Sequence, residues 1–298
     1  MRKTDLFASL KVVLTVIILI LLVRNFAFTS CTIPSSGMEN TLYQGERMWV
    51  NLWSYGLRLP FSTSRWAYQK PLRGEVVLFN NPHPSYSQTP IYQRELFVGR
   101  CVGTPGDTLM LDDELLVTNE RVLNPDSKTL YAYSYADEEK VEKAIKQLNL
   151  TKNPLVGYTE GKHIRSLSHY EYYLLNQRLS TQVKFESVSG KEEKNHPLVI
   201  PGKGMTLQIY PWNQTLLCNT LVLHEKKQAY IQNDTLYVEG KPTFSYTFTQ
   251  DYYWMVANNP INLCDSRLFG LVPHSHLKGR ATRIWFSKQK ERILQAIQ

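Results

Sequence analysis

The stretch RGEVVLFN, residues 73–80, decides the fold class. Gly74 to Asn80 is an apolar run with β-branched residues and turn residues at its ends, which indicates a buried strand. Similar short runs recur along the chain, and Asn233-Asp234 and Glu239-Gly240 mark turns between them. We therefore predict a mainly β fold, with further strands at Arg47–Asn51, Thr206–Tyr210, Leu221–His224 and Leu236–Val238.

Few segments have helical character. Asp137–Leu148 (DEEKVEKAIKQL) combines helical spacing with an acidic start, and a second helix is expected over His169–Arg178. The tail Lys288–Gln298 predicts a short amphipathic helix with a basic face, either a plain terminal helix or one that lies on a membrane.

Composition limits the partners. The 298 residues carry a formal net charge of +8, which suits an anionic membrane surface or nucleic acid. We find no block of Lys and Arg and no nucleic-acid motif, so we predict no nucleic-acid partner. The cysteines show no CxxC pair and no ligand spacing, so no metal and no cofactor are expected. Outside the cytosol, one or two disulfides could form, in a pairing that the sequence leaves open, among Cys31, Cys101, Cys218 and Cys264.

The N-terminal region has the length and composition of a membrane anchor. Leu6–Phe28 contains the uncharged run Val12–Val23 and, with its flanks, is long enough to span the hydrocarbon layer. Arg2 and Lys3 favour a cytoplasmic N-terminus. A cleaved signal peptide is the alternative, but no small-residue cleavage site follows the apolar run. We expect residues 1–5 in the cytoplasm, 6–28 in the inner membrane as a single pass, and the rest outside the cytoplasm.

Four segments, in the same order, resemble bacterial type I signal peptidase. They are Ile33–Leu42 (IPSSGMENTL), Arg73–Asn80, Arg100–Asp107 (RCVGTPGD) and Ala257–Arg280. The resemblance implies a signal-peptidase-like antiparallel β domain with a β-rich insertion, preceded by one N-terminal transmembrane helix. On this basis we assign residues 29–114 and 251–298 to the β core and residues 115–250 to an inserted second domain.

The resemblance also implies where the family's catalytic relay should be. In that family a serine attacks the peptide carbonyl and a lysine amine accepts its proton, a Ser-Lys variant of the nucleophile–base pair. A further serine orients the lysine. The matched positions are Gly37 for the nucleophile, Gly99 for the base and Leu263 for the orienting serine. Because glycine supplies neither a nucleophile nor a base, we predict that the relay is missing.

Other matched positions keep the family's residue types. Ser35 lies where the family has a hydroxyl that stabilises the oxyanion, and Ile33, Ser35 and Met38 are the expected substrate-binding residues. Asp265 and Arg267 match a structural acid–base pair. An extended peptide could therefore still bind as an added strand, with its small side chains held in the cleft.

Other residues offer alternative chemistry. Ser36 could act as a displaced nucleophile, although neighbouring strand residues point to opposite faces, so we expect it to face away from the cleft. Cys101 and Cys264 lie near the lost relay, where we expect buried or disulfide-bonded cysteines rather than nucleophiles. His274 and His276 are expected in a solvated loop.

These patterns predict a membrane-anchored, catalytically inactive relative of signal peptidase I. Its expected partners are the lipid bilayer, the signal peptides of exported preproteins, and an active signal peptidase. An active signal peptidase with a displaced relay is the second hypothesis, and a structural subunit without peptide affinity is the third.

Overall fold

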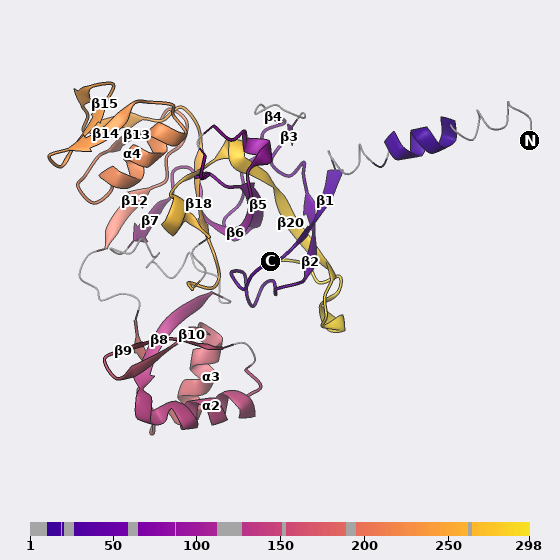
Figure 1. Cartoon of the computed structure of the whole chain (residues 1–298), viewed down its shortest axis with the longest axis vertical. Helices are drawn as coiled ribbons and strands as arrows, with labels where there is room; N and C mark the ends of the chain where they lie inside the picture. The colour runs from indigo at the N-terminus through magenta and orange to yellow at the C-terminus, as the bar shows by residue number, and fades with distance from the viewer. Residues whose placement is uncertain are drawn as a thin grey trace, which may run out of the picture.

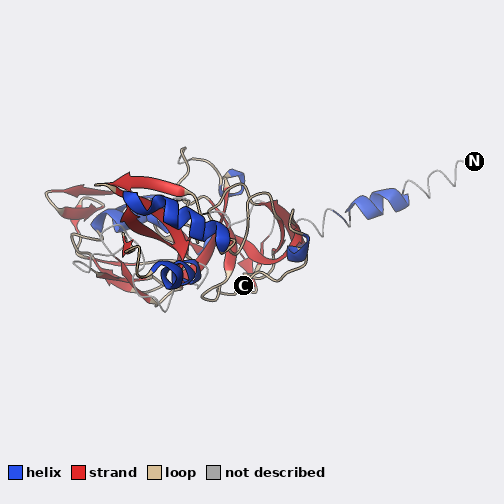
Figure 2. Ribbon diagram, turned by 90° about the horizontal axis from the view of Figure 1, so that it is seen from below, coloured by secondary structure: helices blue, strands red, loops and turns tan. Residues whose placement is uncertain are grey.

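The computed structural model describes residues 11–18, 20, 27–58, 65–86, 88–111, 127–150, 153–188, 195–261 and 264–298. The fold is mainly β, as predicted, and strands (red) are more prominent than helices (blue) in Figure 2. The largest sheet is antiparallel and runs in the order β1-β2-β20-β5-β6-β18-β19 (Figure 1). Its strands are β1 (Phe28–Thr32), β2 (Arg47–Asn51), β5 (Val76–Asn80), β6 (Leu96–Gly103), β18 (Tyr252–Val256), β19 (Val272–Pro273) and β20 (Leu277–Phe286).

Strand β5 lies at the centre of this sheet, and all five of its residues are buried. Its side chains alternate between two apolar clusters, one on each face of the sheet, which explains why the run is continuously apolar. Leu78 pairs with Val98 on one face, while Phe79 pairs with Phe97 on the other. The first cluster contains Ile33, Met38, Leu42, Met48, Val50, Val76 and Leu78. The second contains Tyr55, Val77, Phe79, Cys101, Tyr253, Met255 and Phe269.

A second body of structure packs against the far end of this sheet. Tyr252 and Trp254 of β18 join its core, which also holds Leu109, Leu198 and Leu217. Its elements are β7 (Thr108–Leu111), β12 (His196–Val199), β13 (Thr206–Gln208), α4 (Gln214–Leu223), β14 (Ala229–Gln232), β15 (Thr235–Val238), β16 (Lys241–Pro242) and β17 (Ser245–Thr247).

Residues 127–188 form a separate α/β lobe, seen at the bottom of Figure 1. A sheet in the order β11-β8-β10-β9 carries two helices, and their apolar faces share one core. The elements are β8 (Lys128–Ser134), α2 (Glu138–Gln147), β9 (Leu155–Thr159), β10 (Lys162–Ser168), α3 (His169–Leu179) and β11 (Glu186–Ser187). The expected insertion, 115–250, is thus divided between this lobe and the body built on β7 and β18.

The remaining elements are short. Strands β3 (Leu57–Arg58) and β4 (Arg65–Trp66) form a two-stranded sheet, and α5 (Ser266–Phe269) follows the last turn before β19. The 3-10 turns are η2 (Ile91–Gln93), η4 (Tyr135–Asp137), η5 (His274–His276) and η6 (Lys290–Arg292).

Both helices predicted in the inserted region are confirmed, as α2 and α3. The prediction of a strand at Leu221–His224 is wrong, because Leu221 lies in α4 and is buried with Leu217, one helical turn earlier. The predicted terminal helix over Lys288–Gln298 is also wrong. Only η6 forms there, and Ile297 is buried in the sheet core while Ala296 bridges to Arg283. Tertiary contacts thus override the amphipathic pattern.

The predicted anchor is only partly described. Residues 11–18 are helical, whereas 6–10, 19 and 21–26 lie outside the described residues. Phe28, which we placed at the end of the anchor, is instead the first residue of β1. Within the part of the chain that the structure describes, no helix is both long enough and apolar enough to cross a membrane.

Candidate functional site

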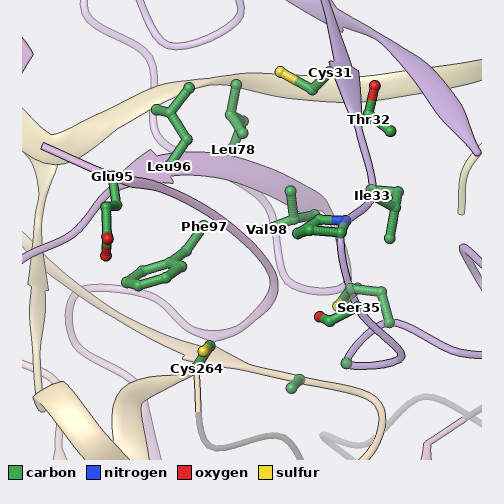
Figure 3. A pocket seen from close by; sticks show the side chains of 14 residues that line it. Cys31, Thr32, Ile33, Ser35, Leu78, Glu95, Leu96, Phe97, Val98 and Cys264 are labelled. Carbon is green, nitrogen blue, oxygen red and sulfur yellow. The ribbon is translucent and has the colours of Figure 1, made fainter. Parts of the chain in front are cut away.

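A groove of about 580 Å³ lies between the segment after β1 and the start of β6 (Figure 3). It brings together Ile33, Ser35, Gly37 and Met38 from the predicted site. Its other described lining residues are mostly apolar and come from several elements: Cys31, Thr32, Pro34, Leu78, Glu95, Leu96, Phe97, Val98, Ala257 and Cys264. The expected substrate-binding residues therefore share one cavity.

Both strands beside the groove have an open edge. Strand β1 is the outermost strand of its sheet, and β18 pairs with β6 only from Arg100 onward. Glu95 and Cys101 direct backbone groups toward the β5 side, where Glu95 O accepts from Asn81 N–H and Cys101 N–H donates to Glu75 O. Since antiparallel strands alternate, the backbone groups of Leu96 and Val98 point to the other side, toward the groove.

Gly37 and Gly99, the positions where the dyad was expected, are both buried. Gly37 lines the groove, and its carbonyl accepts a hydrogen bond from the Asn259 N–H at 3.0 Å. Gly99 pairs with Val77, and a Cβ placed on it would lie 3.4 Å from both Met255 Cβ and Phe79 Cε1. Neither is among the described glycines with positive φ. Backbone geometry therefore does not demand glycine at either position.

The alternative nucleophile is poorly placed. Ser35 lines the groove, but Ser36 is not among its described lining residues. Within the described ranges, the Ser36 carbonyl accepts a hydrogen bond from the Glu39 N–H at 3.1 Å. Among the described residues, none hydrogen-bonds the Ser36 hydroxyl. Leu263, the orienting position, lies outside the described residues.

The thiols near the site are not activated. All four cysteines are free. Cys101 is buried within β6, as expected. The expectation of a buried or disulfide-bonded cysteine is wrong for Cys264, which is exposed and lines the groove together with Cys31. Burial raises the pKa of Cys31, Cys101 and Cys264, so each thiol stays protonated near neutral pH. A thiol nucleophile would need the opposite shift.

The expectation of a solvated loop at His274 and His276 is wrong, because both side chains are buried in η5. His274 Nδ1 lies 3.1 Å from the Tyr253 hydroxyl, and His276 Nε2 lies 2.9 Å from Arg94 Nη1. Packing against β18 and the β5–β6 connection excludes water from them. Among the described residues, no group of three or more His, Cys, Asp or Glu side chains could hold a metal ion.

Asp265 and Arg267 form a buried ion pair beside the groove. Arg267 Nη2 lies 2.6 Å from Asp265 Oδ2, and the Asp265 carboxylate also caps α5 by accepting from the Arg267 backbone. The same carboxylate accepts from the Ala257 N–H at 3.0 Å. It thus ties α5 to the chain that leaves β18, next to Ala257 of the groove wall.

A buried polar network joins the Gly37 segment to the inserted α/β lobe. Lys128 Nζ lies 3.2 Å from Glu39 Oε2 and donates to Asn153 Oδ1 at 3.0 Å. Asn259 Nδ2 donates to the same Glu39 oxygen at 3.2 Å, while its own Oδ1 accepts from the Ser166 hydroxyl. These bonds hold the residue two positions after Gly37 in one orientation.

A second set of charges anchors the other end of that segment. Glu46 accepts from the Tyr43 N–H at 2.8 Å, the Ser287 hydroxyl at 2.8 Å and Arg292 Nε at 2.6 Å. Burial tends to raise the pKa of Glu46, but the hydrogen bonds from Arg292 and Tyr43 outweigh it and keep the pKa below its ordinary value. Glu46 is therefore ionised at neutral pH.

The sequence analysis did not identify the buried charged residues that anchor the Gly37 segment, namely Glu39, Glu46, Arg100 and Lys128. Arg100 is almost fully buried, and its guanidinium donates to Thr41 Oγ1 at 2.7 Å and to the Gly74 carbonyl at 2.6 Å. A charged residue inside the apolar run FVGRCVG was the only available signal for it, since a buried arginine needs partners. Nothing local to Lys128 or Glu39 indicates that they meet.

A curled antiparallel sheet whose open strand edges face one apolar groove can receive an extended chain as an added strand. The sequence profile described as "Signal peptidase, peptidase S26" matches residues 6–286, and the chain belongs to this family.

Curated relatives agree with this assignment. The chain is 25% identical to signal peptidase I of Buchnera aphidicola subsp. Schizaphis graminum, over 97% of this chain and 78% of that protein. It is 24% identical to signal peptidase I of Haemophilus influenzae, over 97% of this chain and 71% of that protein. With signal peptidase I of Helicobacter pylori strain 26695 it shares 23% identity, over 91% of this chain and 79% of that protein.

Proposed function

We propose that this protein is a membrane-anchored signal-peptidase-I-like protein that does not cleave peptides. It binds the signal peptides of exported preproteins, or serves as a partner subunit of an active signal peptidase. The observation that carries this proposal is Gly37 on the groove wall, at the nucleophile position, together with Gly99 at the base position.

The missing groups explain the loss of activity. Peptide-bond cleavage by this scaffold needs a hydroxyl to attack and a neutral amine to accept its proton. Near Gly99 a side chain would meet Met255 and Phe79, which are apolar. Once the serine is absent, a lysine amine in such surroundings brings only a desolvation cost, so its loss is neutral or stabilising.

The groove supports retained peptide binding. Open backbone groups on Leu96 and Val98 can bond an added strand, and apolar walls can take small side chains. Neither contribution needs the relay. Asp265 and Arg267 serve a structural role in this proposal, because they fix α5 against the groove wall.

The lipid bilayer is the second proposed partner. The apolar N-terminal segment leads into β1, and exposed aromatic side chains gather on β1, β2 and their neighbours. Tryptophan is favoured at the headgroup level, so these rings suit a membrane surface. They are Phe28, Trp49, Trp53, Trp66 and Phe286. The proposed location is the inner membrane, with a single pass and the bulk of the chain on the extracytoplasmic side.

An active enzyme with a displaced relay is the alternative, and it rests on the family assignment and on Ser36, whose hydroxyl lies beside the lost position. The decisive experiment restores the relay. Gly37→Ser, Gly99→Lys and Leu263→Ser are introduced together, and the wild type, the triple variant and Ser36→Ala are assayed on one preprotein.

We expect cleavage by the triple variant alone. A Cβ at position 99 would make ordinary 3.4 Å contacts with Met255 and Phe79, and these apolar surroundings would lower the pKa of a lysine amine there, as catalysis requires. Gly37→Ser alone is the matched control and should stay inactive. Cleavage by the purified wild type, with host enzyme excluded, would overturn the proposal. If Ser36→Ala then abolished it, the displaced relay would be established.

A further inference from the structure

The groove carries one carboxylate that nothing in the fold explains. Glu95 is the only charged residue among the described residues that line it. Its side chain is exposed, and it forms no ion pair with any described residue. The neighbouring carboxylate, Asp265, is neutralised by Arg267. Glu95 is therefore free to meet a ligand.

Glu95 and the apolar residues Leu96 and Leu78 lie on opposite faces of the open edge of β6. We call the face that carries Glu95 the acidic side and the face that carries Leu96 and Leu78 the apolar side. Figure 3 shows Glu95 and Phe97 turned toward Cys264, while Leu96, Leu78 and Cys31 lie at the opposite side. This division follows from strand alternation, since residues two apart share a face. A strand added along β6 would therefore place alternate side chains against an apolar side and an acidic side.

Among the described residues, neither Arg94 nor Lys278 forms an ion pair with Glu95. The Arg94 guanidinium is turned away, where it donates to the Thr89 and Asn81 carbonyls and contacts His276. Lys278 acts on Cys31, at the other side of the groove, where it partly offsets the rise that burial causes in the thiol pKa. Glu95 therefore has no cationic partner among the described residues, although the whole chain is basic.

We propose that the groove selects extended peptides with a lysine or arginine on the Glu95 side and apolar residues on the Leu78 side. This inference rests on the proposed peptide-binding function and names its substrate class. Glu95 is four residues before Gly99, a distance of about 13 Å along a strand. The basic residue should therefore bind roughly four positions from the peptide residue beside Gly99.

The test uses the full-length protein in detergent and fluorescent ten-residue peptides. Leucine alternates with serine, because the leucines fix which face meets the apolar wall. One central serine is replaced by lysine, by norleucine or by glutamate, and one leucine is replaced by lysine in a further peptide. Fluorescence polarisation gives each Kd for the wild type, Glu95→Gln and Glu95→Lys. Glu139→Gln, an exposed glutamate on α2, is the matched control variant.

We expect the serine-to-lysine peptide to bind about two- to fivefold tighter than its norleucine counterpart, the range of an exposed ion pair. The preference should vanish in 0.5 M salt, as screening requires, and in Glu95→Gln. It should turn toward the glutamate peptide in Glu95→Lys and stay unchanged in Glu139→Gln. Lysine in place of a leucine should weaken binding.

Two failures are distinguishable. Equal affinity for the lysine and norleucine peptides, or a lysine preference that survives Glu95→Gln, would overturn this inference and leave peptide binding intact. If no peptide in the set bound the wild type, the proposed peptide-binding function itself would be refuted.

Discussion

Replacing Lys128 with methionine tests how the inserted lobe holds the Gly37 segment. The lysine side chain is 1% exposed and the Glu39 side chain 11% exposed, so the ion pair is largely shielded from solvent. Methionine keeps most of the apolar stem but removes the charge. It leaves the Glu39 carboxylate with the hydrogen bond from Asn259 and without a cation.

The expected cost follows from this burial. Removing one partner of a buried ion pair typically destabilises a protein by about 3–5 kcal/mol, because the other charge stays buried. The remaining bond from Asn259 and the slight exposure of Glu39 favour the low end, about 3 kcal/mol. Adding Glu39→Gln removes the stranded charge, so the double variant should recover at least half of that loss.

Hydrogen exchange is the suitable assay, since a chain with several lobes need not unfold in two states. The Lys128 N–H donates to the Asn258 carbonyl, so the first amides of β8 report opening between lobe and core. About 3 kcal/mol corresponds to roughly hundredfold faster exchange there. Lys140→Met is the matched control. Lys140 pairs with Asp137 at the surface and should change exchange less than about fivefold.

Exchange in Lys128→Met within threefold of the wild type would refute the reasoning. So would a double variant as labile as the single one, because the loss would then not come from an unpaired Glu39.

Three further predictions concern the folded core. Glu46→Gln should destabilise the protein at pH 7. It should also make the fall of the melting temperature at acidic pH less steep, as measured by thermal unfolding over a range of pH. The lowered folded pKa of Glu46 gives stability above its ordinary 4.5, which is lost as the pH falls further. Burial, with Arg65 nearby, lowers the pKa of His274 from 6.5 to about 4, so stability should fall between those values as the unfolded chain binds the proton first. In His274→Gln the loss of stability between these pH values should be smaller. An unchanged dependence of stability on pH would contradict this prediction. Gly103→Ala would place a Cβ 2.9 Å from Ile200 Cγ1 and should cost about 1–3 kcal/mol in urea unfolding. Gly99→Ala, whose nearest contacts are at 3.4 Å, should stay within about 0.5 kcal/mol.

Local pattern was sufficient where buried and exposed residues alternate with the period of one structure. β2 and α2 were predicted to within a residue or two, because Arg47–Asn51 and Asp137–Leu148 show clear periods and boundaries. It failed at Leu221 and at Ile297, where the same apolar residues suit more than one structure and long-range packing selects among them.

The site divides in the same way. Chemical identity is written in the chain, so the absence of a hydroxyl at Gly37 and of an amine at Gly99 can be read before any folding is known. Which side chains share the groove cannot, because Glu95, Cys264 and Ser35 are far apart in sequence and meet through the curl of one sheet. The same holds for Lys128 and Glu39, separated by 89 positions (128 − 39) yet 3.2 Å apart. Such pairs depend on how whole strands pack, a cooperative outcome of the entire core that no short segment encodes.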